Sequence, residues 1–480
     1  MIHQEMLVNG CLLGGPCDGS IGKDLIRAPW DGHLVGTAAE GGWSEMDSAL
    51  HAASEAFPAW RDAPHSVRQD LLSRVAAAVR ERKDEFAGLL CDEVGKPITM
   101  ARAEVDRLAL TLELSSQLNL DPADLDVSYD PRGAGTQVSV QRFPLGVVLA
   151  ITPYNWPFNL AAHKLGPALV AGNTVVLKGS SLSPLCTLQL ARIFHECGCP
   201  PGVLNAVHVP TPISAKAVRD PRVKKISFTG SPAVGWNIKA ERSKIPVTLE
   251  LGGNAFGIIE PDADLAAAAR DLATSAFGYA GQICISAQHA LVHRSIYSEF
   301  CEALIEQVHN FPTGDPREEK VLCGPLISEE AAIKVETWIE AALQAGGREM
   351  VRGLRTGTLL HPSLIELPEF AGAAKAGLQL ASDEVFGPVL TVSPYHDLAG
   401  AISWVQASSF GIHTSLYTQS DEAIGRAYRE LDVSGLLINR PPSLRFDSMP
   451  YGGQRQSGFG REGVEWALHE MTTPKVLIRG

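Results

Sequence analysis

Four polar side chains in the middle of the chain have types and positions suited to enzymatic chemistry. Glu250 closes a hydrophobic run, and Cys284 lies in a loop after a predicted helix. A buried carboxylate is costly unless it is paired or used, and a cysteine is a nucleophile only as a thiolate. Asn155 lies in a proline-bounded turn, and Lys178 ends a buried apolar run. Taken singly, a loop asparagine usually binds its own turn, and most buried cysteines are inert.

A glycine-containing turn could bind a phosphate. Thr229, Gly230 and Ser231 join a predicted strand to a predicted helix in the stretch FTGSPAVG. Glycine lets a backbone approach phosphate, and a helix N-terminus supplies amide donors and the positive end of the helix dipole. The turn lacks the Gly-Lys-Ser/Thr of a Walker A loop, and many strand-to-helix turns contain Gly and Ser, so alone it is weak evidence.

A second glycine pattern, G-x-G-x-x-G at residues 458–463, lacks the context of a dinucleotide-binding turn. That fingerprint needs a strand before the glycines, a helix after them and an acidic residue about 20 positions further on. Loop-forming residues precede Gly458, and the sequence to Gly480 leaves no room for the acid and a second strand. We therefore expect the cofactor site elsewhere.

Short apolar strands alternate with helices in the middle of the chain. The runs rich in β-branched residues are 146–152, 173–178, 203–209, 224–229 and 246–251. This repeated alternation predicts a parallel, doubly wound, Rossmann-like α/β sheet, with ligands at the carboxyl ends of its strands. From about Asp262 the alternation resumes and predicts a second α/β unit. The first third is predicted to be helical, with helices over residues 66–94 and 98–118.

The overall composition argues against several classes of protein. The chain has 480 residues, of which 45% are hydrophobic and 20% charged, and its formal charge of −13 disfavours a basic nucleic-acid-binding face. Apolar stretches such as GVVLAI are too short to span a membrane, and no secretory signal is visible, so a cytoplasmic location is expected. Nine cysteines then indicate reduced thiols. The stretch HECGC, residues 195–199, lacks zinc-site spacing, so no metal is expected.

Seven short motifs together resemble the aldehyde dehydrogenase superfamily in order and spacing, from about Leu7 to the C-terminus. They are P-Y-N-W-P (153–157), V-V-L-K (175–178), F-T-G-S (228–231), L-E-L-G-G-N (249–254), G-Q-I-C (281–284), E-V-F-G-P (384–388) and P-Y-G-G…S-G-x-G-R-E (450–462). Each motif alone is modest evidence. Seven in the family's order over about 300 residues are strong evidence.

The resemblance implies NAD(P)-dependent oxidation of a small polar aldehyde to its carboxylic acid. Cys284 resembles the nucleophile, whose thiolate attacks the aldehyde carbon and forms a thiohemiacetal. The Asn155 amide and the Cys284 backbone N–H resemble the oxyanion hole. Hydride transfer to the nicotinamide leaves a thioester, and Glu250 resembles the general base that activates water for its hydrolysis.

The same resemblance implies a site for NAD or NADP. Its implied contacts are Thr152, Lys178, Ser181, Gly230, Ser231, Glu384 and Phe386. Lys178 would contact the adenosine ribose, Ser231 and the helix after it the pyrophosphate, and Glu384 the nicotinamide ribose. The family's common K-P-x-E is K-G-S-S at residues 178–181, so the acid that often grips the ribose 2′-hydroxyl is missing. Ser181 can instead donate to a 2′-phosphate, which favours NADP or both cofactors.

Candidate substrate contacts are Arg107, Tyr154, Arg440 and Arg445. Loop 441–453 resembles the P-[ST]-x-R-x-D-x-M-P-[FY]-G-G pattern of lactaldehyde and non-phosphorylating glyceraldehyde-3-phosphate dehydrogenases, which act on short hydroxy- or phospho-aldehydes. The arginines could bind a substrate anion, although arginines more often lie on solvated faces or form structural pairs. Ile283 stands where members that bind phosphorylated aldehydes often carry arginine, which argues against a phosphate.

The family fold implies three parts and an oligomer. The expected parts are an NAD(P)-binding domain over residues 1–120 and 141–248, a catalytic domain over 249–435, and a small β oligomerisation element over 121–140 and 462–480. Such an element would build a homodimer or homotetramer.

Two alternatives to this function stay open. A CoA-acylating semialdehyde dehydrogenase passes the acyl group to CoA and needs no water-activating glutamate, so Glu250 disfavours it. A catalytically silent binding or structural member of the same fold is disfavoured by the presence of Cys284, Asn155 and Glu250 together.

Overall fold

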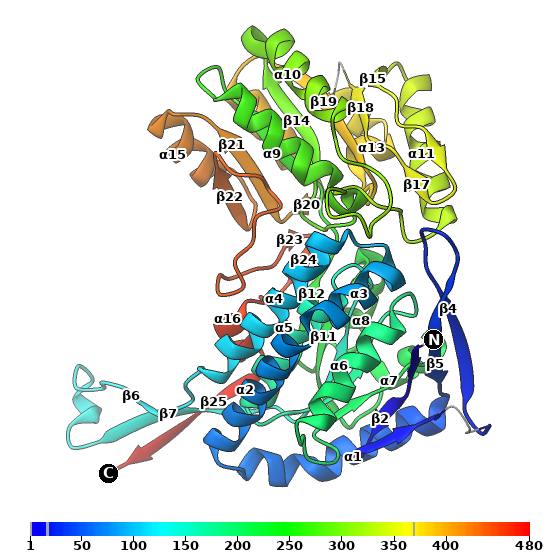
Figure 1. Cartoon of the computed structure of the whole chain (residues 1–480). Coiled ribbons are helices and arrows are strands. Elements are labelled where there is room, and N and C mark those ends of the chain that lie inside the picture. Colours follow the sequence, from blue (N-terminus) through cyan, green and yellow to red (C-terminus); the bar gives the residue numbers. More distant parts are fainter. Residues whose placement is uncertain (1, 16–18, 368–369) are drawn as a thin grey trace.

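The protein is described by a computed structural model over residues 2–15, 19–367 and 370–480, and it folds into two α/β lobes (Figure 1). In the first lobe eight strands form one sheet in the order β24-β12-β11-β8-β9-β10-β2-β3. Their bounds are β2 (Met6–Val8), β3 (Cys11–Leu13), β8 (Val147–Ile151), β9 (Thr174–Lys178), β10 (Leu204–Ala206), β11 (Val223–Thr229), β12 (Val247–Glu250) and β24 (Gly458–Phe459). The central run from β12 to β10 is parallel, and the flanking strands are antiparallel to their neighbours. The predicted Rossmann-like sheet is confirmed.

Helices surround this sheet. They are α1 (Trp43–Asp62), α2 (His65–Glu81), α3 (Lys83–Val94), α4 (Ile98–Ser116), α5 (Pro157–Val170), α6 (Pro184–Glu196), α7 (Thr211–Val218) and α8 (Pro232–Glu241). The single helix predicted over residues 66–94 is wrong, because Arg82 leaves the helical region (φ −106°, ψ 23°) and separates α2 from α3. Every residue of α5 is buried, so the polar side chains of this helix must find partners inside the protein.

The second lobe carries a sheet of seven strands in the order β15-β18-β19-β14-β13-β21-β22. The strands are β13 (Ala255–Ile259), β14 (Ala287–His293), β15 (Arg348–Val351), β18 (Ser363–Glu366), β19 (Val389–Tyr395), β21 (His413–Tyr417) and β22 (Gly435–Ile438). The helices are α9 (Leu265–Phe277), α10 (Tyr297–His309), α11 (Glu329–Gln344), α12 (Phe370–Lys375), α13 (Gln379–Ser382), α14 (Leu398–Ala407) and α15 (Asp421–Glu430). Only β15 runs antiparallel to its neighbour in this sheet. The predicted second α/β unit is confirmed.

Short strands from the C-terminal segment lie where the lobes meet. β23 (Gln454–Arg455) pairs with β20 (Phe410–Gly411), and β24 pairs with β12. A Cβ on Gly458 would lie 2.5 Å from the carbonyl oxygen of Leu249, so glycine is required for this pairing. The G-x-G-x-x-G pattern therefore serves the close approach of two strands.

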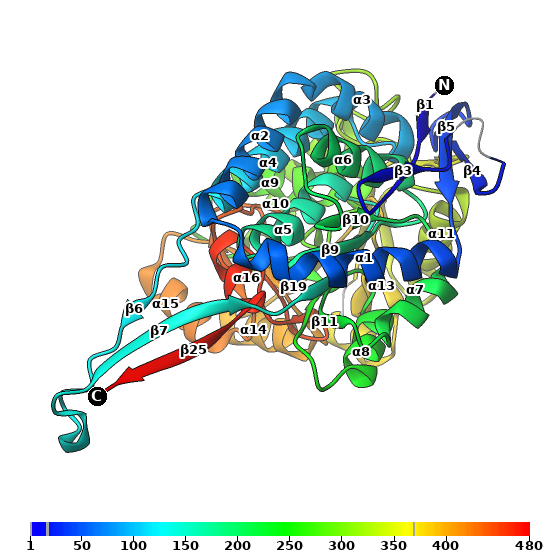
Figure 2. The same ribbon diagram turned by 90° about the horizontal axis from the view of Figure 1, so that it is seen from below.

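A three-stranded arm projects from the first lobe (Figure 2). It consists of β6 (Ala123–Asp124), β7 (Gln137–Pro144) and β25 (Thr472–Arg479), and β25 pairs with β7 along its whole length. The apolar side chains of Val476, Leu477 and Ile478 are 58%, 51% and 65% exposed. Before the arm, α16 (Val464–Glu470) packs against α5.

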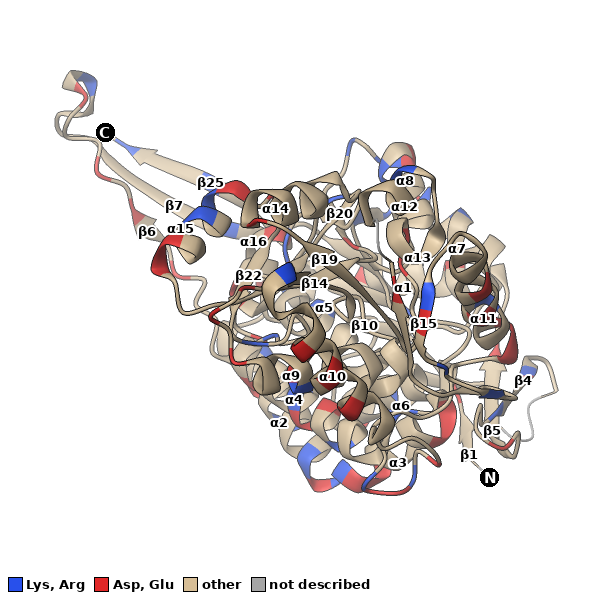
Figure 3. Ribbon diagram, turned by 90° about the horizontal axis from the view of Figure 1, so that it is seen from above, with Lys and Arg blue, Asp and Glu red and all other residues tan. Residues whose placement is uncertain are grey.

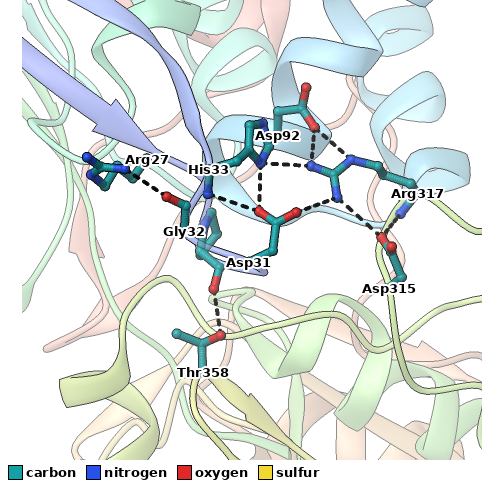
Figure 4. Close-up of polar contacts among 9 residues, drawn as sticks. Arg27, Asp31, Gly32, His33, Asp92, Asp315, Arg317 and Thr358 are labelled. Carbon is teal, nitrogen blue, oxygen red and sulfur yellow. Dashed lines mark hydrogen bonds and ion pairs between the residues drawn. The ribbon is translucent and has the colours of Figure 1, made fainter.

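An N-terminal hairpin joins the two lobes at their outer edge (Figure 4). It is formed by β4 (Gly22–Arg27) and β5 (Leu34–Glu40), with β1 (Ile2–Gln4) beside β5. Arg317 of the second lobe contacts Asp31 of the hairpin at 3.4 Å and Asp92 of α3 at 2.9 Å. Thr358, between β16 (Arg355–Thr356) and β17 (Leu359–Leu360), donates to the Pro29 carbonyl. Because these ion pairs are half exposed, each contributes little alone.

In the view of Figure 3, helices carry both Lys or Arg positions and Asp or Glu positions among the described residues. Among the helices of the described residues, none has the length and apolarity needed to cross a membrane. The same residues contain no cluster of His, Cys, Asp and Glu with metal-binding geometry.

Candidate active site

Three segments meet at the carboxyl end of β12, and two glycines let them approach. Glu250 ends β12, and Gly252 and Gly253 follow it. A Cβ on Gly253 would lie 2.1 Å from the carbonyl oxygen of Cys284. A Cβ on Gly252 would lie 2.5 Å from a carboxylate oxygen of Glu384. The backbone contact leaves no room for a side chain at Gly253, and a side chain at Gly252 would displace the Glu384 carboxylate, so the two glycines bring the three predicted site residues together.

Cys284 follows a tight left-handed turn. Tyr279, Ala280 and Gly281 have φ values of 51°, 52° and 69°, which is unusual for the first two residue types. The Sγ atom of Cys284 lies 3.0 Å from the hydroxyl of Tyr451. Burial raises the pKa of the Cys284 thiol to about 11, and the Tyr451 hydrogen bond opposes this rise. The thiol is therefore protonated at neutral pH and must lose its proton before it can attack.

Asn155 is tied to the segment that carries Cys284. Its side-chain Nδ2 donates to the main-chain carbonyl of Gln282 at 2.8 Å, and Asn155 is buried. The Gln282 side chain accepts from the Tyr154 hydroxyl at 3.1 Å and from the backbone N–H of Ile327 at 3.0 Å. The structure therefore brings Asn155 and Tyr154 to the nucleophile candidate through one glutamine.

A buried ion pair holds the start of α5, directly after Asn155. Glu104 accepts the backbone N–H groups of Phe158 and Asn159 at 3.0 and 3.1 Å, and it pairs with Lys96. The Lys96 ammonium also lies 3.7 Å from the centre of the Trp156 ring. Both charged side chains are fully buried, so they are partnered as burial requires. This arrangement fixes the turn that presents Asn155.

Glu250 is buried, and its two carboxylate oxygens have no hydrogen-bond partner among the described residues. Burial, and then the charge of Glu462, raise the pKa of Glu250 well above its usual range. Lys164 of α5 binds Glu462 at 2.6 Å, which favours the ionised form of Glu462. An uncommitted carboxyl group with a raised pKa, whose charge acts on the Cys284 thiol, has the properties of a general base.

Loop 441–453 is anchored to the first lobe through Asp447. This buried carboxylate receives two hydrogen bonds from Arg107, at 2.6 and 3.0 Å. It also binds Asn159 at 3.2 Å and His163 at 2.9 Å, both on α5. Despite its burial, the bonds from His163 and Arg107 hold the pKa of Asp447 well below its usual range. The anchor fixes the loop that carries Arg445 and Tyr451.

Of the four predicted substrate contacts, three lie at this junction. Tyr154 contacts Gln282, and Arg107 contacts Asp447. Arg445 lies on the ring of Tyr451, with its guanidinium carbon 3.7 Å from the ring centre. Arg440 is instead exposed at the end of β22. Burial raises the pKa of Asp271 on α9, and the positive charge of Arg440 opposes this rise. The structure does not bring Arg440 to the others.

The predicted nicotinamide contacts lie on the second lobe, facing Tyr154. Glu384 accepts the backbone N–H of Gly253 at 3.0 Å, and burial raises its pKa to about 7. Phe386 has a φ of 55°, and its ring meets that of Tyr154 edge to face at 6.1 Å. A bulky residue in this backbone region is strained, and such strain is common at functional sites.

The predicted phosphate contacts offer polar atoms that the protein does not use itself. The hydroxyls of Thr152 and Thr229, at the carboxyl ends of the paired strands β8 and β11, are buried without a partner among the described residues. Ser231 precedes α8, and its side chain caps no backbone N–H. Gly230 leaves the turn without a side chain. Free hydroxyls at a helix N-terminus suit a pyrophosphate, so these residues fit a dinucleotide.

The predicted adenosine contacts lie further along the same edge. Lys178 ends β9 and is buried, and burial lowers its pKa. Ser181 is exposed in the turn between β9 and α6. An exposed hydroxyl beside a buried ammonium could contact a 2′-phosphate.

Four residues of the site escaped prediction: Gln282, Tyr451, Lys164 and Glu462. All four lie in predicted features: Gln282 is in the G-Q-I-C motif, Tyr451 and Glu462 are in the motif 450–462, and Lys164 is in a predicted helical segment. The polar residues Asn159, His163 and Lys164 within this largely apolar helical run were the signal that indicated buried partners.

Comparison with known proteins defines the class. A model of the aldehyde dehydrogenase family matches residues 23–477, and this chain belongs to that family. The resemblance inferred from the seven motifs is confirmed, and with it the prediction of an NAD(P)-dependent oxidoreductase that acts on aldehydes.

Individual relatives cover nearly the whole chain. The 3-sulfolactaldehyde dehydrogenase of Priestia aryabhattai is 36% identical over 414 residues, 86% of each protein. The lactaldehyde dehydrogenase of Methanococcus aeolicus is 31% identical over 465 residues, 95% of this chain and 97% of that one. The NADP-dependent glyceraldehyde-3-phosphate dehydrogenase of Bacillus halodurans, solved in complex with NADP, is 30% identical, with a TM-score of 0.94 and 100% coverage of both chains.

Proposed function

We propose that this protein oxidises a small polar aldehyde to its carboxylic acid through a thioester on Cys284. The observation that carries the proposal is the meeting of Cys284, Glu250 and the Asn155–Gln282 contact at the end of β12. In the proposed reaction the Cys284 thiol first loses its proton to solvent, the thiolate Sγ then bonds to the aldehyde carbon, and the carbonyl oxygen takes the negative charge. The Asn155 amide and the Cys284 backbone N–H stabilise that oxygen.

Glu250 completes the proposed reaction as the base. A bound nicotinamide would supply the hydride acceptor, so that loss of hydride from the thiohemiacetal leaves a thioester on Cys284. Glu250 then takes a proton from water, which attacks the thioester carbon and releases the acid. The Glu250 carboxylate has no hydrogen-bond partner in the part of the chain that the structure describes, which supports this role. It also disfavours the CoA-acylating alternative, which has no use for a water-activating base.

The cofactor in this proposal is NADP, or either cofactor. Thr152, Gly230 and Ser231 would hold the pyrophosphate, Lys178 and Ser181 the adenosine ribose, and Glu384 with Phe386 the nicotinamide ribose and ring. The serine at position 181 supports acceptance of a 2′-phosphate because it brings no negative charge. The NADP complex of the Bacillus halodurans relative is in keeping with this preference.

The proposed substrate is short and carries a second polar group. Arg445 supports an anionic group, since its side chain is 6% exposed and its Nε and Nη2 atoms lack hydrogen-bond partners among the described residues. Arg107 is committed to Asp447 and is the weaker candidate. Ile283 beside Cys284 argues against a phosphate. Relatives named for sulfolactaldehyde and for lactaldehyde represent the anionic and the neutral alternative.

The arm supports a homodimer or homotetramer as the working form. Exposed Val476, Leu477 and Ile478 on a strand with a free edge favour burial against a second copy. The proposal includes a cytoplasmic location, which is supported by the cysteine content and by the sequence features described above.

The test is initial-rate cofactor reduction with NAD and NADP in parallel. The aldehydes are lactaldehyde, glyceraldehyde, glyceraldehyde 3-phosphate, phosphonoacetaldehyde, succinate semialdehyde and uncharged alkyl aldehydes. A kcat/KM that is highest for anionic aldehydes, and that falls with Arg445→Gln more for anionic than for neutral aldehydes, supports an anion anchor. A preference for neutral aldehydes means that Arg445 does not bind substrate. Failure to reduce either cofactor with any aldehyde, by a folded protein, favours the silent alternative.

A further inference from the structure

The Tyr451 hydroxyl is held directly against the sulfur of Cys284. The Oη–Sγ distance is 3.0 Å although 167 residues separate the two in sequence. Tyr451 is buried, and two backbone hydrogen bonds with Glu462, at 2.9 and 2.7 Å, fix its main chain. Its ring also meets that of His413 edge to face at 5.6 Å. The hydroxyl therefore has little freedom to turn away from the sulfur.

A buried arginine covers the same ring. The guanidinium carbon of Arg445 lies 3.7 Å from the centre of the Tyr451 ring, within the range of a cation–π contact. The nearest carboxylate to this guanidinium is Glu462, whose Oε2 is 3.7 Å from Nη2, too far for a hydrogen bond. A positive charge on the ring face withdraws electron density from the phenol, so its O–H becomes a stronger donor.

The surroundings of the sulfur make such a donor important. Cys284 lies in a small apolar cluster with Ile283, Ile285, Ile412 and Met449. These side chains cannot stabilise a thiolate, and burial without a donor disfavours the charged form. A hydrogen bond from a neutral phenol favours the anion, because a thiolate is a much better acceptor than a thiol.

We propose that Tyr451 is a further catalytic residue, which donates a hydrogen bond to the Cys284 thiolate, and that Arg445 is a positioning residue that strengthens this donor from the far face of the ring. The inference rests on the proposed function, in which Cys284 is the nucleophile. The titratable groups that face Cys284 and Tyr451 are Glu250, Glu384, Arg445 and His413. Burial lowers the pKa of His413 to about 4, so it is neutral wherever the thiol titrates.

The test is the pH profile of Cys284 alkylation by iodoacetamide, without cofactor or aldehyde. Tyr451→Phe keeps the ring, its packing and the arginine contact, and removes only the hydroxyl. We expect the midpoint to rise by about one pH unit, so that alkylation at pH 8 slows about tenfold. Peptide mass spectrometry assigns the modification to Cys284 among the other cysteines. Thermal unfolding of each variant verifies that it is folded.

Tyr395→Phe is the matched control. Tyr395 is also buried and also uses its hydroxyl, which donates to the carbonyl of Ile259 at 3.0 Å in the second lobe. The Tyr395→Phe substitution should leave the alkylation midpoint of Cys284 unchanged. An equal shift in both variants would mean a general loosening of the lobe and would overturn the catalytic role of Tyr451, as would an unchanged midpoint in a folded Tyr451→Phe protein.

A double-mutant cycle tests the part assigned to Arg445. Arg445→Met alone should raise the alkylation midpoint, as Tyr451→Phe does. Arg445→Lys should raise the midpoint less than Arg445→Met, because lysine keeps the charge but cannot stack its head group flat on the ring. In the Tyr451→Phe background, Arg445→Met should raise the midpoint less than in the wild type, since the part that acts through the hydroxyl is gone and only the direct effect of the charge on the sulfur remains. Full additivity would mean that the arginine acts on the sulfur directly and would overturn its positioning role.

The outcome is separable from that of the proposed function. Alkylation needs neither aldehyde nor cofactor, so an unchanged Tyr451→Phe profile leaves the thioester mechanism standing. Normal turnover by the Cys284→Ser protein would instead show that Cys284 is not the nucleophile, whatever the alkylation profile shows.

Discussion

The side-chain amide of Asn155 lies 2.8 Å from the carbonyl oxygen of Gln282, two residues before Cys284. This bond joins the strand-to-helix turn of the first lobe to the cysteine loop of the second. Because Glu104 and Lys96 hold the start of α5 just after the turn, the position of the amide is set by a buried network. The oxyanion contact in the proposed mechanism is thus prearranged across the lobe boundary.

Asn155→Ala should lower kcat/KM by about 10² to 10³, because one donor to the developing oxyanion is lost. Steady-state kinetics with the best aldehyde measure this loss. Asn119→Ala, in an exposed stretch after α4, is the control and should keep normal kinetics. A loss of less than tenfold in a folded Asn155→Ala protein would contradict the assignment.

Asp447→Asn should raise KM and lower stability by about 1 to 3 kcal/mol, because a buried carboxylate that binds Arg107 and two groups of α5 is replaced by a neutral amide. Urea unfolding and steady-state kinetics provide the measurements. The control is Asp130→Asn, whose partner Arg132 is 90% exposed, and it should change neither quantity. Equal behaviour of the two variants would mean that Asp447 does not anchor the loop.

Ser181→Glu should shift the cofactor preference toward NAD, because a carboxylate there accepts a bond from the ribose 2′-hydroxyl and repels a 2′-phosphate. The measurement is the ratio of kcat/KM for NADP to that for NAD. Ser181→Ala separates the loss of the hydroxyl from the added charge. An unchanged ratio in the Ser181→Glu protein would mean that Ser181 does not contact the cofactor.

The stability of the protein should fall in mild acid. Burial lowers the pKa values of His163, His289 and His413 from 6.5 to about 4, 3 and 4. Since the unfolded chain takes up these protons first, the stabilisation is present above pH 6.5 and is lost as the pH falls toward about 4. Urea midpoints from pH 7.5 to 4.5 should show a shallower decline in His289→Gln than in exposed His51→Gln. Identical slopes would contradict this origin.

Much of the fold was predictable because it is encoded locally. The apolar run 146–152 became the strand Val147–Ile151, and Gly95 ended α3 in the left-handed conformation with φ of 66°, as helix-terminating glycines do. The break at Arg82 was not predictable, since the apolar periodicity continues through it. At the break Arg82 pairs with Glu196 of α6, a contact between distant parts of the chain that the sequence does not show.

The site was predictable only as a set of residues. Glu250, Cys284 and Asn155 were found from motifs, but the contact of Cys284 with Tyr451 spans 167 residues and has no local signal. Arg440 and Arg445 were equivalent candidates by sequence. The loop geometry separates them, because it turns one toward solvent and buries the other on the tyrosine ring.

In the proposed mechanism the acyl group is carried on Cys284 and is released by water that Glu250 activates. The most direct measurement is the intact mass of Glu250→Gln protein, quenched in acid seconds after mixing with NADP or NAD and the best aldehyde. We expect most of the Glu250→Gln protein to gain the mass of the acyl group, and the protein that combines Glu250→Gln with Cys284→Ser to gain none. A Glu250→Gln protein that reduces cofactor in a first turnover without any gain in mass would contradict the thioester mechanism.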